Sequence, residues 1–232
     1  MTRTGTQAGK PAGRGSVRIT GTGTSAGGDF DKVAVTGEAV IQGELRCDRF
    51  TCVGTCSVEG GVSAKRLRLL GEARVEGKLE GGELRLTGSV DARGGASAAR
   101  IVVLGELKSG GDVEADKLRA RGVFAIDGLL NCEETELILY GRSRIRELGG
   151  GRIRVRRRGF RPLKVWFQVA GPEELTAKTI EGDDVYLEHT QADVVRGKRI
   201  ELGPGCRIGR VEYSETFLRH KTAEVGEARK AE

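Results

Sequence analysis

The fold of this 232-residue chain is decided by six consecutive 17-residue segments, which begin with VAVTGEAVIQGELRCDR (33–49) and FTCVGTCSVEGGVSAKR (50–66). The next four are LRLLGEARVEGKLEGGE (67–83), LRLTGSVDARGGASAAR (84–100), IVVLGELKSGGDVEADK (101–117) and LRARGVFAIDGLLNCEE (118–134). Two glycine series keep this register, namely Gly37, Gly54, Gly71, Gly88, Gly105, Gly122 and Gly43, Gly60, Gly77, Gly94, Gly111, Gly128. A fixed period of this length is typical of a solenoid built from repeated coils.

Each segment contains three pairs of apolar or small residues, and one residue separates the two members of a pair. In the third segment these pairs are Leu67/Leu69, Ala73/Val75 and Leu79/Gly81. A spacing of two is the period of a strand with one buried face. Three short strands per coil predict a parallel β-helix with a triangular core and glycines at the bends. A helical interpretation fails because every helix would contain interior glycines, at about 1 kcal/mol each relative to alanine.

The edges of the repeat predict five regions. We expect a disordered tail at 1–16, regular coils over 17–152, a basic irregular segment at 153–176, further coils at 177–216 and a polar tail at 217–232. The segment 152–171 breaks the pattern, since it contains the only Trp, two Phe and a Pro. The spacing returns at Ile200, Leu202, Cys206 and Ile208.

Composition favours a cytoplasmic protein. The chain has no run of about 18 apolar residues that could form a transmembrane helix, and its first residues lack the apolar core of a secretory signal. The five cysteines are therefore expected to be thiols. Cys47, Cys52 and Cys56 have a spacing that does not match structural zinc sites, and their places in the repeat predict burial in the core. We predict no metal and no cofactor, because the glycine-rich stretch 21–28 has no βαβ context for a nucleotide.

Enzyme activity is not expected. His189 and His220 are the only histidines, so a histidine-based relay has few candidates. Left-handed β-helix acyltransferases use 18-residue coils of hexads, whereas this chain has 17-residue coils. An enzyme of that kind would require a defined cleft beside His189.

The net charge of +6 is unevenly distributed along the sequence. The net charge, counted as Lys and Arg residues less Asp and Glu residues, is +3 over 1–32, −2 over 33–134, +8 over 135–171 and −3 over 172–232. Alternation with Ile153 and Val155 predicts that three arginines share one face of a strand. The candidate residues for binding an anionic surface are Arg152, Arg154, Arg156, Arg157, Arg158, Arg161 and Lys164. Such a patch fits an anionic membrane, an acidic neighbouring subunit, or nucleic acid, for which no base-reading motif is present. A solvated face without a partner remains an equal alternative.

A solenoid has two open ends, and no amphipathic capping helix is evident in the sequence. Unpaired strand edges and terminal core residues at such ends favour end-to-end stacking into an open filament. The alternative is a monomeric or dimeric β-helical binding module that uses the patch between Arg152 and Lys164.

The glycine-punctuated coils, the opening GTGTSAGGDFDKVAVTG (21–37) and the closing LEHTQADVVRGKRIELGPGCRIGRVEYSET (187–216) resemble the bactofilin family in its longer, polymer-forming form from Firmicutes. The resemblance covers about residues 17–216. It implies a right-handed β-helix that polymerises without nucleotide into nonpolar cytoskeletal filaments and scaffolds client proteins, often at the inner face of the membrane. Some members bind membrane through a short apolar N-terminal segment, which this chain lacks. The family's polymerisation contacts correspond to Val17, Ile19, Phe30, Ile208, Val211, Tyr213 and Phe217.

Overall fold

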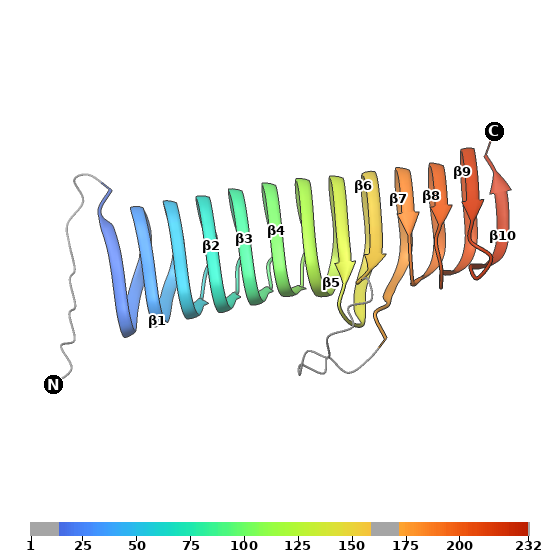
Figure 1. The fold of residues 1–232 in the computed structure, drawn as a ribbon. Helices are drawn as coiled ribbons and strands as arrows, with labels where there is room; N and C mark the ends of the chain where they lie inside the picture. Colours follow the sequence, from blue (N-terminus) through green and yellow to red (C-terminus); the bar gives the residue numbers. More distant parts are fainter. Residues whose placement is uncertain (1–13, 159–171, 232) are drawn as a thin grey trace.

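The computed structural model describes residues 14–158 and 172–231. Within these residues the chain forms ten strands and no helix, and all strands pair in parallel in sequence order from β1 to β10. The result is an elongated β-solenoid of about ten turns with β1 and β10 at opposite ends (Figure 1). The predicted all-β, parallel β-helical fold is confirmed.

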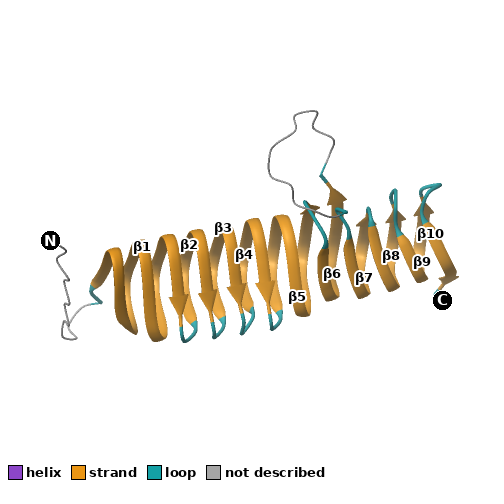
Figure 2. Cartoon of the chain, turned by 90° about the horizontal axis from the view of Figure 1, so that it is seen from below, coloured by secondary structure: helices purple, strands orange, loops and turns teal. Residues whose placement is uncertain are grey.

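The long strands wrap around the coil corners, so several of them cover more than one side of the solenoid (Figure 2). Their bounds are β1 Ser16–Val58, β2 Val62–Val75, β3 Leu79–Ala92, β4 Ala96–Ser109, β5 Val113–Leu139, β6 Ser143–Arg157, β7 Leu175–Leu187, β8 Thr190–Leu202, β9 Arg207–Arg219 and β10 Glu224–Lys230.

The register explains the sequence period. Phe50 of β1 pairs with Leu67 of β2, which pairs with Leu84 of β3, so each coil advances by 17 residues. One of the later coils is shorter, because Val185 of β7 pairs with Ile200 of β8, 15 residues further on, whereas β9 and β10 again pair at 17 residues. Successive strands in a sheet are about 4.8 Å apart, so each coil lengthens the solenoid by that distance.

The core is formed by three inward-facing pairs in each coil. In the coil that begins with β2 these are Val62/Ala64, Leu67/Leu69 and Ala73/Val75, and all six are buried. The five cysteines are likewise buried and free, as the repeat predicts. Apolar side chains therefore stack on equivalent side chains of the neighbouring coils along the whole length.

Gly71 shows why the first glycine series is required. Its φ of +128° lies in the region that L-residues rarely adopt, and a Cβ there would clash with the carbonyl oxygen of Gly54 one coil below. Gly60, from the second series, has no such φ, but a Cβ would lie 2.5 Å from the carbonyl carbon of Gly43. Gly71 and Gly60 thus both allow a close backbone approach that a side chain would prevent.

The structure changes the expected domain boundaries. The segment 153–176 does not separate two blocks of coils, because β6 extends to Arg157 and pairs directly with β7, which begins at Leu175. Residues 217–232 are not simply a polar tail, since β9 extends to Arg219 and β10 adds a further strand over Glu224–Lys230. The described coils therefore form one solenoid from Ser16 to Lys230. The expected tail at 1–16 lies largely outside the described residues.

Candidate functional site

The C-terminal end of the solenoid is an open strand edge. Glu224–Lys230 of β10 pairs with Arg207–Tyr213 of β9, and no described strand pairs with the outer edge of β10. Tyr213, Phe217 and Val225 lie there, partly buried against the core. The rings of Tyr213 and Phe217 are 5.5 Å apart. This end combines unpaired backbone groups with incompletely covered apolar side chains.

Two of the predicted polymerisation residues are not at this end. Ile208 is 3% exposed and pairs with Val225, while Val211 is 0% exposed and pairs with Ala228. β10 covers both residues, so they belong to the core and cannot contact another subunit. The error follows from the expected tail, because without β10 the coil that contains Ile208 would be terminal.

The N-terminal end presents the other three predicted contacts. Val17, Ile19 and Phe30 are partly buried and pack against the core from the first coil of β1. The Asp31 N–H donates a hydrogen bond to the Gly15 carbonyl at 3.0 Å, which closes this coil. The first coil has no further described coil on its outer side, so its apolar side chains are covered on one side only.

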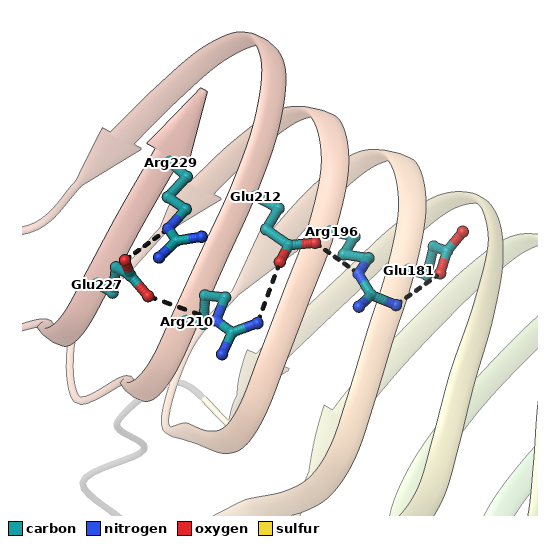
Figure 3. Close-up of polar contacts among 6 residues, drawn as sticks. All are labelled: Glu181, Arg196, Arg210, Glu212, Glu227 and Arg229. Carbon is teal, nitrogen blue, oxygen red and sulfur yellow. Dashed lines mark hydrogen bonds and ion pairs between the residues drawn. The ribbon is translucent and has the colours of Figure 1, made fainter. Parts of the chain in front are cut away.

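Alternating charges connect the C-terminal coils, as Figure 3 shows. Arg196 bonds Glu181 at 3.8 Å and Glu212 at 2.7 Å, and Arg210 bonds both Glu212 and Glu227 at 3.5 Å. Arg229 completes the series at 2.5 Å from Glu227. The Arg196 guanidinium holds the pKa of Glu212 below its usual value through their hydrogen bond. These pairs link β7, β8, β9 and β10 and reach the terminal strand.

The basic segment has the orientation that alternation predicts. Arg152, Arg154 and Arg156 are exposed, whereas Ile153 and Val155 are both 0% exposed. Arg156 lies over the ring of Tyr186, at 5.5 Å from its centroid.

Two neighbouring arginines of this segment have partners within the chain. Arg157 bonds Glu173 at 3.1 Å, and Arg158 lies 4.9 Å from the centroid of the Tyr140 ring. Arg161 and Lys164 lie outside the described residues. Among the five described residues of the predicted patch, only Arg157 makes an ion pair.

The structure reveals a larger basic surface that the sequence analysis missed. Fifteen outward-facing residues lie on one side of five coils between Arg49 and Arg121, and we call this surface the basic face. The register of the strands aligns these residues in three columns. These columns are Arg49, Arg66, Glu83, Arg100, Lys117; Thr51, Arg68, Arg85, Val102, Arg119; and Val53, Leu70, Thr87, Leu104, Arg121. Eight of the fifteen are basic and one is acidic. Segment totals hid this face, because the acidic residues of the same coils lie on the other sides.

The basic face has a hydrophobic margin. Val53, Leu70 and Leu104 occupy one column in line with Thr87, and they are 41%, 41% and 49% exposed. Thr87 interrupts this row between Leu70 and Leu104, and exposed aliphatic side chains gathered on one side of a sheet are typical of a contact surface.

His189 borders a hollow of about 680 Å³ that is lined by Tyr140, Arg157, Glu173, Glu174, Arg207 and Thr222, among others. The φ of His189, +45°, is the only positive value among the described non-glycine residues, and the His189 ring packs against Gly205. The charged groups of the hollow bind one another, since Arg207 bonds Glu174 at 3.0 Å and Arg157 bonds Glu173. Cys206 is buried and its thiol bonds the Leu187 carbonyl. The hydroxyl of Thr222, another lining residue, lies 2.9 Å from Nδ1 of His220.

The cysteines show the chemistry of buried thiols. Burial raises the pKa of Cys47, Cys132 and Cys206 to about 11. In the described part of the chain, no three His, Cys, Asp or Glu side chains are placed to hold a metal ion, and no helix is long and apolar enough to cross a membrane.

Comparison with known proteins identifies two relatives in Bacillus subtilis, and both are described as uncharacterized. The chain is 47% identical to YhbF over 87 residues, which cover 37% of this chain and 34% of YhbF, so it matches about a third of that protein. It is 47% identical to YhbE over 226 residues, which cover 89% of this chain and 94% of YhbE. No family model and no solved structure matches. Because the match to YhbE extends over nearly the whole of both proteins, this chain belongs to the same family as YhbE.

Proposed function

We propose that this protein is a non-enzymatic cytoskeletal scaffold of the bactofilin kind, whose solenoids stack end to end into filaments without nucleotide and organise client proteins at or near the cell membrane. The observation that carries the proposal is the open strand edge at each end of the described solenoid. The terminal strands pair with their neighbours in the same parallel arrangement as the strands between them.

Stacking two copies would satisfy the terminal backbone groups and cover the apolar residues at the ends. An unpaired edge is a template for further strand pairing unless it is blocked. At the C-terminal end Phe217, Tyr213 and Val225 are only partly buried, and at the N-terminal end Val17, Ile19 and Phe30 are in the same situation. Both like and unlike ends can meet in this way, and either arrangement propagates into an open filament.

The test is negative-stain electron microscopy of the purified chain without nucleotide, together with sedimentation. Wild-type protein is expected to form filaments that pellet. Phe217→Arg and Val225→Arg are each expected to abolish pelleting, because either change places a charge in the contact between coils. The matched control is Leu218→Arg, since Leu218 neighbours Phe217 but its side chain is 64% exposed.

Circular dichroism separates lost assembly from lost folding. A variant that stays small while keeping a β-rich spectrum supports end stacking. Filaments that persist in both end variants, or wild-type protein that remains monomeric, would contradict the proposal.

A second candidate function is a binding module for an anionic surface, and the outward orientation of Arg152, Arg154 and Arg156 favours it. Arg152 is paired in register with Asp184. Arg199 lowers the pKa of the Asp184 carboxyl most, and Arg152 lowers it further. Arg154 makes no ion pair with a described residue. The triple change of these arginines to Glu should abolish sedimentation with vesicles of anionic lipid if the module is correct.

A further inference from the structure

The basic face carries cations that the chain itself does not neutralise. Three of its eight basic residues have partners, since Arg85 bonds Glu83 at 2.9 Å, Lys117 bonds Glu134 at 3.2 Å and Arg119 bonds Glu136 at 3.6 Å. Five others make no ion pair with any described residue, namely Arg49, Arg66, Arg68, Arg100 and Arg121. Their charges remain available to a partner.

A cluster of carboxylates lies on an adjacent side of the solenoid. Between β4 and β6 a hollow of about 490 Å³ is lined by Glu114, Asp116 and Glu133, and small residues including Ala98, Ala99, Ala115 and Gly150 complete it. We call it the acidic hollow. Its three carboxylates make no ion pair with a described residue, and no basic residue lines it. Burial is the main cause of the raised pKa of Cys132, and the negative charges of Asp116 and Glu114 raise it further. The local potential is therefore negative.

We propose that neighbouring filaments associate side by side, with the basic face of one copy on the acidic hollow of a second copy. Both surfaces belong to the same coil lattice, so charges of neighbouring coils, such as Arg49 and Arg66 on the basic face, stand about 4.8 Å apart. Two solenoids with parallel axes therefore bring arginines of successive coils opposite carboxylates of successive coils. The row of Val53, Leu70 and Leu104 adds apolar area at the margin. A contact between basic faces is excluded by like charge.

The size of the surface indicates that this contact acts only between filaments. Five coils at about 4.8 Å each give a length of roughly 24 Å. Three outward residues across a strand give a width of about 17 Å. The resulting area of about 400 Å² per partner is half of what a stable complex buries. End-to-end stacking repeats the weak contact along a filament and multiplies its strength. The inference thus rests on the proposed scaffold function.

The test uses the full chain and measures the width of assemblies by negative-stain microscopy and their pelleting at low centrifugal force. At about 0.05 M salt the wild-type chain is expected to form bundles or sheets. At about 1 M salt, where charges are screened beyond about 3 Å, it is expected to form single filaments. The variant Arg68→Glu with Arg121→Glu is expected to form single filaments at low salt.

Two further variants make the experiment specific. The matched control is Arg142→Glu with Lys178→Glu, two exposed residues outside both surfaces that impose the same change of charge, and it should bundle like wild type. The variant Glu114→Arg with Glu133→Arg should lose bundling. Combining all four changes of the two surfaces in one chain restores opposite charges and should restore bundling.

The outcomes distinguish the two proposals. Single wild-type filaments at every salt concentration, bundles that survive Arg68→Glu with Arg121→Glu, or failure of the combined variant to rescue would overturn side-by-side association alone. If wild-type filaments remain single but pellet with phosphatidylglycerol vesicles or with duplex DNA through the basic face, the partner is that polyanion and the inference is wrong. If no filaments form, both proposals fall.

Discussion

At the scale of single residues, each glycine of the repeat is constrained by φ, by close approach of the next coil, or by both. Three glycines of this chain show these two constraints together, one alone, and neither. Gly71 combines a φ of +128° with a clash that a Cβ would make, Gly43 has a φ of +85° with open space around it, and Gly15 has open space and no positive φ.

Alanine substitutions at these three positions should therefore have graded effects. Gly15→Ala is expected to leave stability unchanged, and Gly43→Ala to cost about 1 kcal/mol for the left-handed conformation. Gly71→Ala is expected to cost about 3 kcal/mol, because the coils must also move apart. Urea unfolding in an assembly-deficient background such as Val225→Arg measures the series. Equal losses at Gly43 and Gly71 would show that close approach contributes nothing.

The buried cysteines predict a pH dependence at alkaline pH. The pKa values of Cys47, Cys132 and Cys206 are about 11 in the folded chain, above the ordinary value of 9.0. The folded state thus holds protons that the unfolded state releases. The stabilisation is fully present below pH 9 and is lost as the pH rises through about 11.

Two measurements check this expectation. Thermal unfolding should show a midpoint that falls between pH 9 and pH 11, less so after Cys132→Ala. A thiol reagent at pH 8 should label the native chain far more slowly than the denatured chain. Rapid labelling of the native chain would mean that these thiols are exposed.

At the scale of elements, the C-terminal strands depend on charge pairs more than the central coils do. β10 spans Glu224–Lys230 and contributes only partly buried or exposed side chains. Glu227 bonds both Arg210 of β9 and Arg229 of β10, so it anchors the last strand.

Glu227→Gln should loosen β10 without unfolding the solenoid. Exposed ion pairs contribute at most about 1 kcal/mol, so global stability should change little. Hydrogen exchange of the β10 amides should accelerate several-fold, whereas exchange in β3 should not change. Asp91→Asn, which removes the partner of Arg74 in a central coil, is the control. Equal acceleration in both variants would contradict a special role for the terminal pairs.

The depressed pKa of Glu212 gives the same region an acid-sensitive component. Its carboxylate is stabilised by Arg196 in the folded state, so this stabilisation is present above the unfolded pKa. It is lost as the pH falls through the folded value, which lies below the ordinary 4.5. The protection factors of the β8 and β9 amides, which correct for the slower intrinsic exchange at acid pH, should therefore fall, and Glu212→Gln should remove that pH-dependent fall.

At the scale of the whole molecule, a solenoid should tolerate removal of a complete coil. Deleting residues 67–83 joins Arg66 to Leu84 and lets the side chains of the two flanking coils stack directly on each other. The shortened chain is expected to keep a β-rich spectrum and to form filaments whose axial repeat is shorter by about 4.8 Å per copy.

A deletion that breaks the register provides the control. Removing residues 67–75 leaves a coil too short to close, and polar residues would have to enter the core. This variant is expected to unfold or aggregate. If both deletions behave alike, stability does not derive from coil-by-coil stacking.

Much of the architecture could be predicted from the sequence because the determinants are local and repeated. The 17-residue glycine period, the pairs with a spacing of two and the inward cysteines all follow from which residues the backbone geometry allows at a bend or in a narrow core. The outward orientation of Arg152, Arg154 and Arg156 follows equally from alternation along a strand.

Only the tertiary structure decided which residues lie at the ends and which share a side. β10 is nearly all polar in sequence, yet it pairs with β9 through its backbone and buries Ile208 and Val211. Segment 33–134 has a net charge of −2, yet one of its sides collects eight basic residues with one acid. The sequence gives the net charge of a coil, whereas the winding of the backbone determines on which side of the solenoid each charged residue lies. The sequence by itself therefore determined the solenoid, and the stacking of its coils determined the surfaces through which it can assemble.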